Sequence, residues 1–499
     1  MQMFSTVVEN TDNLSSVQRV MAEREPLLRQ RKNVVQFEED DKDNPRNWPR
    51  WRKLMAWIPI VPVDLAVSFG ASGYSPVTEK FADAFEISTQ TAVLGLSLYT
   101  LALAFGPMIN APMSEYYGRL PVYMILYGLS LPFFVGSAMA PNFTVFLVTR
   151  FFCGLLQSVT IANLGGTIAD LYDIQHTGKP MSVFIWAATC GSSLGYFLMS
   201  FVAQDRPWQD VFWVLLAVCG GVWFVMCCFI GYAGETRSSV LLRRIAAARQ
   251  KETGETMEVP EEYKAKGMKQ LVVSIQARPF RFLTTESIIV SAAAYNGSLY
   301  GISFLLNGAF ALVFAQGHGY NTMETGLCFA GIILGVSLGP FTNLLQEKLY
   351  VRDSKGGNVP EARLQLSKVA AVAFPVSLFW FAWTSYSWMP AIVPILASAL
   401  WGWSFFTLIL MTYMYTEDSY GEYSSSALAG LGFVRNAAGA GFPLFGRQMF
   451  DGLGYQWAAT ILAFLAVVLA PIPFVLADFG KRLRKRSPYA SEQFEELQD

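Results

Sequence analysis

The chain has 499 residues, of which 53% are hydrophobic and only 15% charged, and its formal net charge is −1. Soluble domains carry about 25% charged residues, so this composition is typical of a protein that faces lipid. A charge balance so close to zero gives no indication of a nucleic acid or another polyanion as partner. The 38 Phe and 13 Trp residues suit lipid contact and the aromatic belts of a membrane protein.

Apolar stretches long enough to cross a bilayer recur twelve times. After a polar N-terminal tail at 1–53 they lie at 54–76, 91–114, 120–140, 143–166, 180–203 and 210–233. After a polar segment at 234–283 they lie at 284–316, 324–346, 367–387, 389–415, 424–447 and 454–477, and a tail at 478–499 ends the chain. A helix crosses the hydrocarbon core with about 20 residues, and only helices satisfy their own backbone in this way. We predict an all-α membrane protein with twelve transmembrane helices.

The stretches divide six and six around the polar segment. This predicts an N-terminal six-helix bundle at 54–233, a central loop at 234–283 and a C-terminal six-helix bundle at 284–477. If both tails are cytosolic, 32 of the 37 Lys and Arg residues lie in or beside cytosolic segments. Positive charge prefers the cytosolic side, so we expect both termini and the central loop there. The plasma membrane is the expected location, with the vacuolar membrane as the alternative.

No arrangement of residues favours catalysis. The string Gly-Ser-Ser-Leu-Gly at 191–195 matches a nucleophile elbow, but that elbow needs a strand-to-helix turn and a histidine base. The string lies within a predicted span, and both histidines, His176 and His318, lie in predicted loops. Glycines at intervals of four are better interpreted as close contacts between packed helices. These glycines are Gly191, Gly195, Gly331, Gly335 and Gly339.

The six cysteines lie in predicted spans without metal-ligand spacing, and no phosphate-binding loop follows a strand. We therefore expect no enzyme activity, no cofactor and no metal. If the protein is a transporter, an ion gradient or the concentration gradient of the cargo itself would drive the transport.

Several short motifs resemble those of the major facilitator superfamily, and some are similar to those of the fungal twelve-span drug:proton antiporters. The superfamily motifs lie at 111–122, 150–154 and 165–170, and those of the fungal branch at 44–49, 235–244 and 440–445. The resemblance implies two pseudo-symmetric six-helix bundles, the major facilitator fold, which work as a secondary transporter.

Two departures from the family pattern bear on the mechanism. The span-5 antiporter motif, usually a repeated Gly-Pro pair, is here the proline-free 191–196, which leaves strict antiport open. In span 7 polyamine exporters carry an acidic residue before an Ala-Phe-Pro run, whereas this chain has Asn307 followed by Gly-Ala-Phe-Ala. A polyamine cargo would need carboxylates, so this substitution disfavours it.

The motif between spans 2 and 3 predicts a gate. Glu115, Gly118 and Arg119 lie there, and Asp170 ends span 4 on the same side. Arg119 is expected to bridge the two carboxylates when the cytosolic face is shut. The resemblance implies a latch between spans 2, 4 and 11. The alternative is that these are ordinary solvated loop charges.

Charges within spans are rare and costly, at about 2.5–3.5 kcal/mol each at mid-bilayer. Asp64 in span 1 and Arg150 in span 4 are predicted to couple transport to protons, because a buried carboxylate near a cation can change charge with water access. A static buried ion pair is the alternative. Glu286, at the start of span 7, is expected to snorkel to the surface rather than to couple.

The cargo site is expected at the midplane between the bundles, on spans 7, 10 and 11. Aromatic faces with a few polar groups suit a bulky, weakly polar or cationic molecule. The candidates are Tyr295, Asn296, Tyr300, Asn307, Trp401, Trp403, Tyr413, Tyr415 and Arg435. The alternative for each is packing or lipid contact.

These patterns favour a proton-coupled exporter of amphipathic drugs, toxins or a fungal secondary metabolite. Its partners would be a small-molecule substrate, protons and the lipid bilayer, and it is expected to work as a monomer. One alternative is a transporter of a defined small metabolite, such as an organic acid or polyamine. Another is a non-transporting membrane receptor or scaffold.

Overall fold

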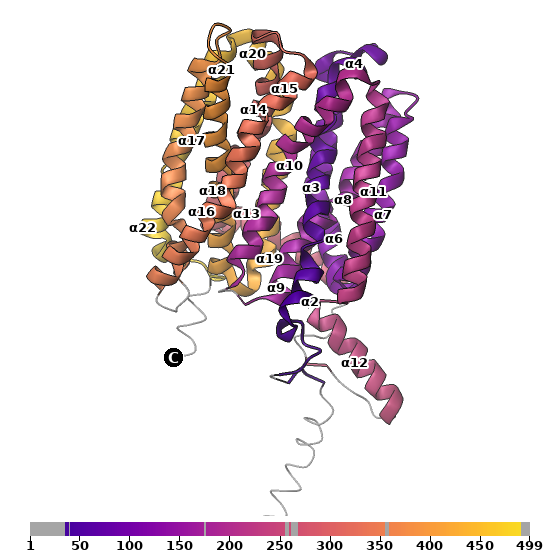
Figure 1. Ribbon diagram of the computed structural model, residues 1–499. Helices are drawn as coiled ribbons and strands as arrows, with labels where there is room; N and C mark the ends of the chain where they lie inside the picture. Colours follow the sequence, from indigo (N-terminus) through magenta and orange to yellow (C-terminus); the bar gives the residue numbers. More distant parts are fainter. Residues whose placement is uncertain are drawn as a thin grey trace, which may run out of the picture.

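The computed structural model describes residues 35–38, 40–173, 176–254, 259–260, 268–354 and 359–490. Within these ranges every regular element is a helix, and the long helices stand side by side (Figure 1). We call the end that carries α2 and α12 the tail end, and the end that carries α4, α15 and α20 the far end. Much of the predicted N-terminal tail, 1–34, and the end of the C-terminal tail, 491–499, lie outside the described residues.

The first half of the chain supplies six crossings. They are η1 (Pro45–Asn47), α2 (Arg50–Trp57), α3 (Ile60–Ser72), η2 (Ser75–Val77) and α4 (Thr78–Ala84) for the first; α5 (Thr89–Ala92) and α6 (Leu94–Tyr117) for the second; α7 (Arg119–Ala138) for the third; α8 (Phe143–Gln157) and α9 (Val159–Leu171) for the fourth; α10 (Gly178–Asp205) and α11 (Trp208–Ala233) for the fifth and sixth.

The second half repeats this plan. Its helices are α14 (Ser287–Leu312) continued by the π-helix η5 (Val313–Gly317); α15 (Thr322–Cys328) and α16 (Ala330–Ser354); η6 (Pro360–Leu364) and α17 (Gln365–Thr384); α18 (Ile392–Tyr420) and η7 (Gly421–Tyr423); α19 (Ser424–Gly441) and α20 (Pro443–Leu453); and α21 (Tyr455–Leu469) with α22 (Ile472–Arg484).

Two segments predicted to be polar and irregular contain helices. The central segment forms α12 (Ser238–Thr253), which projects away from the tail end, and α13 (Met268–Thr285), which leads into α14 (Figure 1). The last crossing does not stop at 477, because α22 continues to Arg484. Polar residues do not interrupt a helix at the surface of a bundle. Hydropathy alone therefore missed α12 and α13 and placed the end of the last crossing too early.

Eleven helical stretches of the described residues are long and apolar enough to cross a membrane. The predicted span at 424–447 is not among them, because α19 is rich in Gly, Ser and Ala, contains Arg435 and gives way to α20 at Phe442. Yet α19 packs on both α6 and α14, so much of its surface meets protein rather than lipid. With α19 and α20 as the remaining crossing, the chain forms the predicted all-α fold of twelve transmembrane helices.

The helices form two bundles that face each other. In the first, α10 packs on α3, and α8 on α6 and α7; in the second, α19 packs on α14, and α16 and α17 on α18. Between the bundles α6 packs on α19 and α10 on α15 and α16. In Figure 1 the indigo-to-magenta half lies beside the orange-to-yellow half along these helices.

Glycines create the closest of these contacts, as predicted. A Cβ at Gly195 of α10 would lie 2.5 Å from Ser72 Oγ and 2.9 Å from the Cα of Phe69 on α3. A Cβ at Gly335 of α16 would collide with the carbonyl oxygen of Ala399 on α18. Backbone atoms cannot move aside as side chains do, so these pairs of helices depend on the missing side chain.

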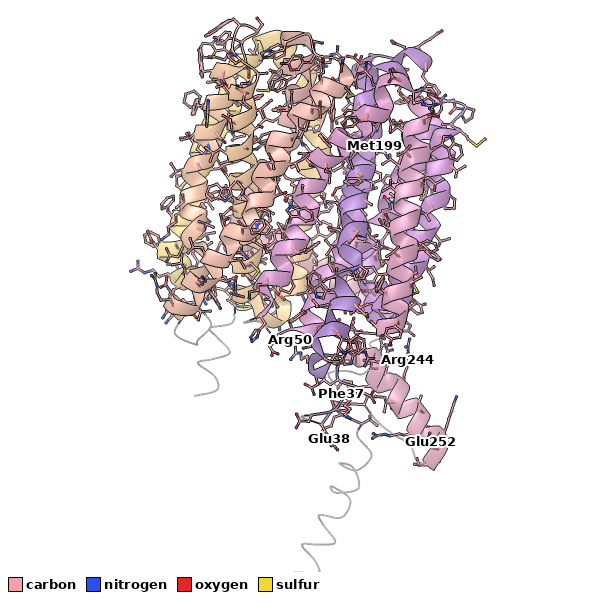
Figure 2. The ribbon with its side chains drawn as sticks, viewed as in Figure 1. Phe37, Glu38, Arg50, Met199, Arg244 and Glu252 are labelled. Carbon is pink, nitrogen blue, oxygen red and sulfur yellow. The ribbon has the colours of Figure 1, made fainter. Side chains whose placement is uncertain are left out.

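The surroundings of the bundles differ along their length. On the outer face of α16, the side chains of Leu334 and Phe341 are 65% and 70% exposed, as lipid contact requires. Figure 2 shows Arg50, Arg244 and Glu252 at the tail end, where charged side chains gather.

We predict that Gly335→Ala destabilises the protein by about 1–3 kcal/mol, the usual effect of overpacking a tight contact. Gly308→Ala is the matched control, because a Cβ at Gly308 of α14 meets no atom within 4 Å. Thermal unfolding in detergent, followed by size-exclusion chromatography, measures both. Equal melting temperatures for the two variants would contradict the contact.

Candidate functional site

Two small adjoining cavities lie between the bundles. The larger borders about 370 Å³ of space without atoms, open solvent included, and is lined by Asp64, Ser68, Ala71, Thr100, Leu103, Ile161, Ala188, Ser192, Tyr300, Phe304, Arg435 and Asn436. The smaller borders about 280 Å³ of such space and is lined by Thr189, Ser192, Ser193, Ser303, Phe304, Asn307, Ile332, Val336, Trp401, Gly402 and Phe405. Both include Ser192 and Phe304. The two cavities therefore form one region with walls from both bundles.

Asp64 brings a carboxylate from α3 to the larger cavity and is 1% exposed. Its Oδ1 accepts a hydrogen bond from the hydroxyl of Thr160 on α9, at 2.7 Å. Its Oδ2 is buried and has no hydrogen-bond partner among the described residues. A buried polar atom without a partner is rare in native proteins and indicates a place that a ligand, water or proton can occupy.

Arg435 brings a guanidinium group from α19, in the other bundle, to the same cavity and is also 1% exposed. Its Cζ lies 5.0 Å from the ring centroid of Tyr300 and 5.4 Å from that of Tyr413. Its Nε and Nη1 have no hydrogen-bond partner among the described residues. Aromatic faces stabilise the charge but leave these N–H groups free for an acceptor.

Arg150 does not reach the cavity and does not form an ion pair with Asp64 within the described chain. Its Nε donates to the carbonyl oxygen of Gly95 at 3.0 Å, and its Cζ lies 4.4 Å from the ring centroid of Tyr99. A carbonyl and aromatic rings therefore accommodate the charge of this fully buried side chain. The cation that shares a cavity with Asp64 is Arg435.

Four of the predicted cargo residues line the cavities: Tyr300 and Arg435 the larger, Asn307 and Trp401 the smaller. The buried Asn307 Oδ1 and Trp401 Nε1 have no hydrogen-bond partner among the described residues. The remaining five candidates do not line either cavity; they are Tyr295, Asn296, Trp403, Tyr413 and Tyr415.

Local bonds explain two of these exclusions. The Asn296 amide donates to the carbonyl of Ala292, one turn earlier in α14, and the indole of Trp403 donates to the hydroxyl of Thr342 on α16. Tyr413 lies beside Arg435 without lining either cavity.

Small hydroxyl residues are the part of the lining that sequence reasoning missed. Ser192 and Ser193 occupy the span-5 segment that lacks the family's prolines, so that departure was the available signal. Ser303 Oγ, on α14, is a further buried atom without a hydrogen-bond partner in the described part of the chain. The site thus combines one carboxyl group, one guanidinium group, several hydroxyl groups and aromatic walls.

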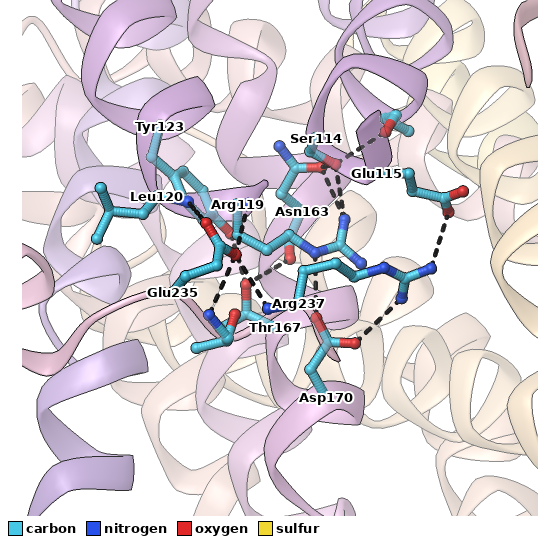
Figure 3. A network of polar contacts seen from close by, with 12 residues as sticks. Ser114, Glu115, Arg119, Leu120, Tyr123, Asn163, Thr167, Asp170, Glu235 and Arg237 are labelled. Atoms are coloured by element: carbon cyan, nitrogen blue, oxygen red, sulfur yellow. Dashed lines mark hydrogen bonds and ion pairs between the residues drawn. The ribbon is translucent and has the colours of Figure 1, made fainter. Parts of the chain in front are cut away.

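A polar network closes the tail end of the first bundle (Figure 3). Arg119 Nε lies 3.2 Å from Asp170 Oδ2, and Arg119 Nη1 donates to Ser114 Oγ at 2.7 Å and to Asn163 Oδ1 at 3.3 Å. The structure therefore brings together Arg119 and Asp170, as expected. Glu115 pairs instead with Arg237, at 3.9 Å, and Arg237 Nη1 contacts Asp170 at 3.2 Å.

Glu235 is the member of this network that the sequence did not single out as a partner. Its carboxylate accepts hydrogen bonds from four backbone N–H groups, those of Arg119, Leu120, Thr236 and Arg237. Gly118, with φ of +106°, lets the chain turn there, and a Cβ at this position would collide with the Glu235 carboxylate. Glu235 lies just after α11, far along the chain, so only the fold could reveal the contact.

The partners of Arg119, Asp170 and Glu115 also correct an expectation about the latch. Within the described residues none of them lies on α19, the predicted third helix. The third partner is the segment that follows α11. The network joins α6, α7 and α9 to the entry of the central segment and lies within one half of the molecule.

The second half contains a comparable network around Arg363, in the loop that corresponds to that of Arg119. The fully buried Arg363 contacts Asp418 at 2.8 Å and Glu347 at 2.7 Å, and its Cζ lies 3.5 Å from the ring centroid of Tyr350. A Cβ at Gly178, the first residue of α10, would collide with the Glu347 carboxylate. Glu347 therefore lies against the other bundle at the tail end.

The bundles also touch toward the far end. The backbone N–H of Met323 on α15 donates to Gln204 Oε1 of α10 at 3.2 Å, and the rings of Tyr196 and Phe329 stack with centroids 4.3 Å apart. The helix α10 thus contacts the second bundle near both of its ends.

This architecture corresponds to a known family. The model of the Major Facilitator Superfamily matches residues 61–443. The chain belongs to this superfamily. It is therefore an integral membrane transporter of small molecules and not an enzyme, as its sequence predicts.

Fungal members of the superfamily are similar over most of the chain. The efflux pump FUB11 of Gibberella moniliformis is 33% identical over 473 residues, which cover 93% of this chain and 79% of that protein. The major facilitator superfamily multidrug transporter mdrA of Aspergillus fumigatus is 34% identical over 463 residues, 92% of this chain and 76% of that protein. The resemblance to fungal exporters extends beyond the short motifs.

Solved structures of other superfamily members share the fold. The proton:xylose symporter XylE aligns with a TM-score of 0.60 and 14% identity, covering 87% of this chain and 96% of XylE. The human organic anion transporter MFSD10 aligns with a TM-score of 0.54 and 16% identity, covering 86% of this chain and 100% of that structure. At these identities the likeness concerns the fold alone.

We predict that Glu235→Ala destabilises the tail end by about 1.5–3 kcal/mol, since hydrogen bonds to a charged group are lost and backbone N–H groups are left without an acceptor. Trypsin cleavage within α12, at Arg243 and Arg244, should become faster. Glu252→Ala, at an exposed position of the same helix, is the matched control. Parental cleavage rates in Glu235→Ala would mean that the network does not hold this segment.

Proposed function

We propose that this transporter exports amphipathic drugs, toxins or a secondary metabolite, coupled to protons. The observation that carries the proposal is the cavity between the bundles, which Asp64 and Arg435 both line with polar atoms that have no hydrogen-bond partner among the described residues. Relatives at 33–34% identity are called efflux pumps and a multidrug transporter, which supports outward transport of such molecules.

The proposed role of Asp64 is to carry the proton. A carboxylate that opens to one side of the membrane and then to the other exchanges its proton with each side in turn. Arg435 favours the charged form of Asp64, and a proton or a cargo molecule that occupies the space between them alters that balance. Arg150 would then be a structural cation whose loss perturbs the packing of α8, rather than a direct partner.

The lining favours a cargo with an apolar ring system and few polar groups. Tyr300, Phe304 and Phe405 supply flat faces, while hydroxyls and amides offer hydrogen bonds. Polyamines have several positive charges and would meet one carboxylate and one guanidinium group, so they fit poorly. A defined organic acid is the second candidate, because the unpartnered Nε and Nη1 of Arg435 suit a carboxylate.

The distribution of Lys and Arg supports an orientation with the tail end toward the cytosol and a place in the plasma membrane. With that orientation, the Arg119 network is proposed to stabilise the state in which the cytosolic side is shut. Glu347 against Gly178 is the contact that would separate when the bundles rock apart. The functional units are proposed to be the bundles at 54–233 and 284–477, each moving as one body.

Purified protein in proteoliposomes tests the coupling directly. An imposed pH gradient should drive uptake or release of an apolar aromatic dye by the parent, and Asp64→Asn should abolish that drive because it cannot exchange a proton. Dye binding and thermal stability should remain measurable in the variant. Full proton-driven flux in Asp64→Asn would falsify the assignment.

The same vesicles separate the cargo classes. Spermidine should compete poorly with the dye, whereas apolar aromatic compounds should compete well. Strong spermidine flux would favour the polyamine alternative. Asp83→Asn, an exposed acid on α4, serves as the control for loss of a carboxylate outside the cavity.

Gating is tested by accessibility. Arg119→Ala removes the cation that holds Asp170, so we predict a greater share of the state open at the tail end and slower turnover. In a chain whose native cysteines are replaced, maleimide labelling of a cysteine placed at Asn343, which is 2% exposed and contacts Gly178 of the other bundle, should become faster than without Arg119→Ala, while the dye affinity changes little. Arg352→Ala, which removes an exposed ion pair with Asp353, is the control. Unchanged labelling with normal flux would mean that these are ordinary surface charges.

A further inference from the structure

The last described residues of the chain, 485–490, pack against the tail end of the second bundle. Ser487 and Ala490 are 6% and 0% exposed. The ring of Tyr489 lies 5.0 Å from that of Phe282 on α13 and 5.3 Å from that of Tyr423 in η7, measured between centroids. We call residues 485–490 the docked segment.

One carboxylate holds this segment in place. The hydroxyl of Ser487 donates to Glu286 Oε2 at 2.5 Å, and the hydroxyl of Tyr420 donates to the same oxygen at 3.1 Å. Glu286 is 4% exposed and does not snorkel to the surface, contrary to expectation. It lies between α13 and α14, so the contact joins the end of the chain to the entry of the second bundle.

The sequence around Ser487 has an unusual combination of features. Arg484, Lys485 and Arg486 precede it and Pro488 follows it. Basic residues just before a serine, and a proline just after it, are surroundings that Ser/Thr protein kinases select. Arg484 is buried against Glu361, whereas Lys485, Arg486 and Pro488 are exposed.

We propose that Ser487 is a phosphorylation site, and that its phosphorylation releases the docked segment from Glu286. A protein kinase would transfer the terminal phosphoryl group of ATP to Ser487 Oγ. The new Oγ–P bond forms as the bond to ADP breaks, and the hydroxyl proton passes to the base of the kinase. A short terminal segment can open locally to give the kinase access.

The chemistry of the contact explains why the modification acts as a release. The phosphorylated Oγ no longer has a hydrogen to donate to Glu286. The phosphate also adds about −1.5 to −2 charges at pH 7, next to a buried carboxylate. Both changes act against the docked state, and neither affects the open one. Arg484 remains bound to Glu361, at 2.8 Å, so the release is confined to the docked segment.

Release would loosen the junction of α13 and α14, where the central segment enters the second bundle. Tyr420, which ends α18, donates to the same oxygen of Glu286, so the loss of Ser487 from that oxygen would change the surroundings of Tyr420 as well. The phosphate state of Ser487 would then alter the rate at which the second bundle moves. The tests below measure docking and phosphorylation and do not depend on the cargo or on the proposed export.

A cysteine at Ala490 reports docking, in a chain whose six native cysteines are replaced. Ser487→Glu should raise the rate of labelling by a water-soluble maleimide about tenfold or more. Ser487→Thr keeps the hydroxyl and should label at the parental rate. Adding Glu286→Gln to Ser487→Glu removes the repulsion and should slow labelling again. Parental labelling of Ser487→Glu, or no effect of the added Glu286→Gln, would overturn the proposed release.

Phosphorylation is tested on the full-length protein in nanodiscs, incubated with ATP and either a kinase that prefers basic residues or one that prefers a following proline. Mass spectrometry should find phosphate at Ser487 in the parent and none there in Ser487→Ala, and Ala490→Cys labelling should rise with the modified fraction. A synthetic peptide of residues 482–490 is the control. Modification of the peptide but never of the protein would show that the segment does not open, and failure of both would remove the kinase site.

Discussion

A charged side chain within a membrane protein has to be matched by other protein groups, and this constraint organises the whole structure. Arg150, Arg363 and Arg119 are each held by carbonyls, carboxylates or aromatic rings. Arg150 and Arg363 each leave one buried nitrogen without a hydrogen-bond partner among the described residues, whereas Arg435 leaves two, and Asp64 leaves one of its two carboxylate oxygens. Asp64 and Arg435 also line a cavity between the bundles, which none of the other three charges does.

Asp64 and Arg435 lie on different bundles. A movement of one bundle relative to the other would therefore change the space between them. The helix α10 contacts the second bundle near both of its ends. In the transport cycle that we propose, these contacts break in turn, at one end and then at the other, while the packing within each bundle persists.

At the tail end of each half, a buried arginine is bound by carboxylates, but the partners differ between the halves. In the first half Arg119 and Glu235 tie the helices to the segment that precedes α12. In the second half Arg363 binds Glu347 and Asp418, while Arg484 binds Glu361. The start of the central segment and the end of α22 are thus each attached to a bundle.

The sequence by itself determined the class of protein, the number of crossings and most of their limits, because hydropathy reports transfer into lipid residue by residue. It also singled out Asp64, Arg435 and Arg119 as candidate functional residues, because a charge in or beside an apolar stretch is costly and therefore informative. The glycines that pack α10 on α3 and α16 on α18 followed from their spacing.

Only the tertiary structure decided which of these residues meet. Glu235 reaches the backbone of Arg119, and Ser487 reaches Glu286, although 116 and 201 residues separate them in sequence. It also showed that Trp403 and Asn296 do not line the cavities and that the indole N–H of Trp403 and the amide N–H of Asn296 donate to neighbouring atoms. Hydropathy and motifs indicate whether a residue prefers lipid or water. The partner of a side chain depends on the rotation and position of its helix, which are set by the packing of all the helices together.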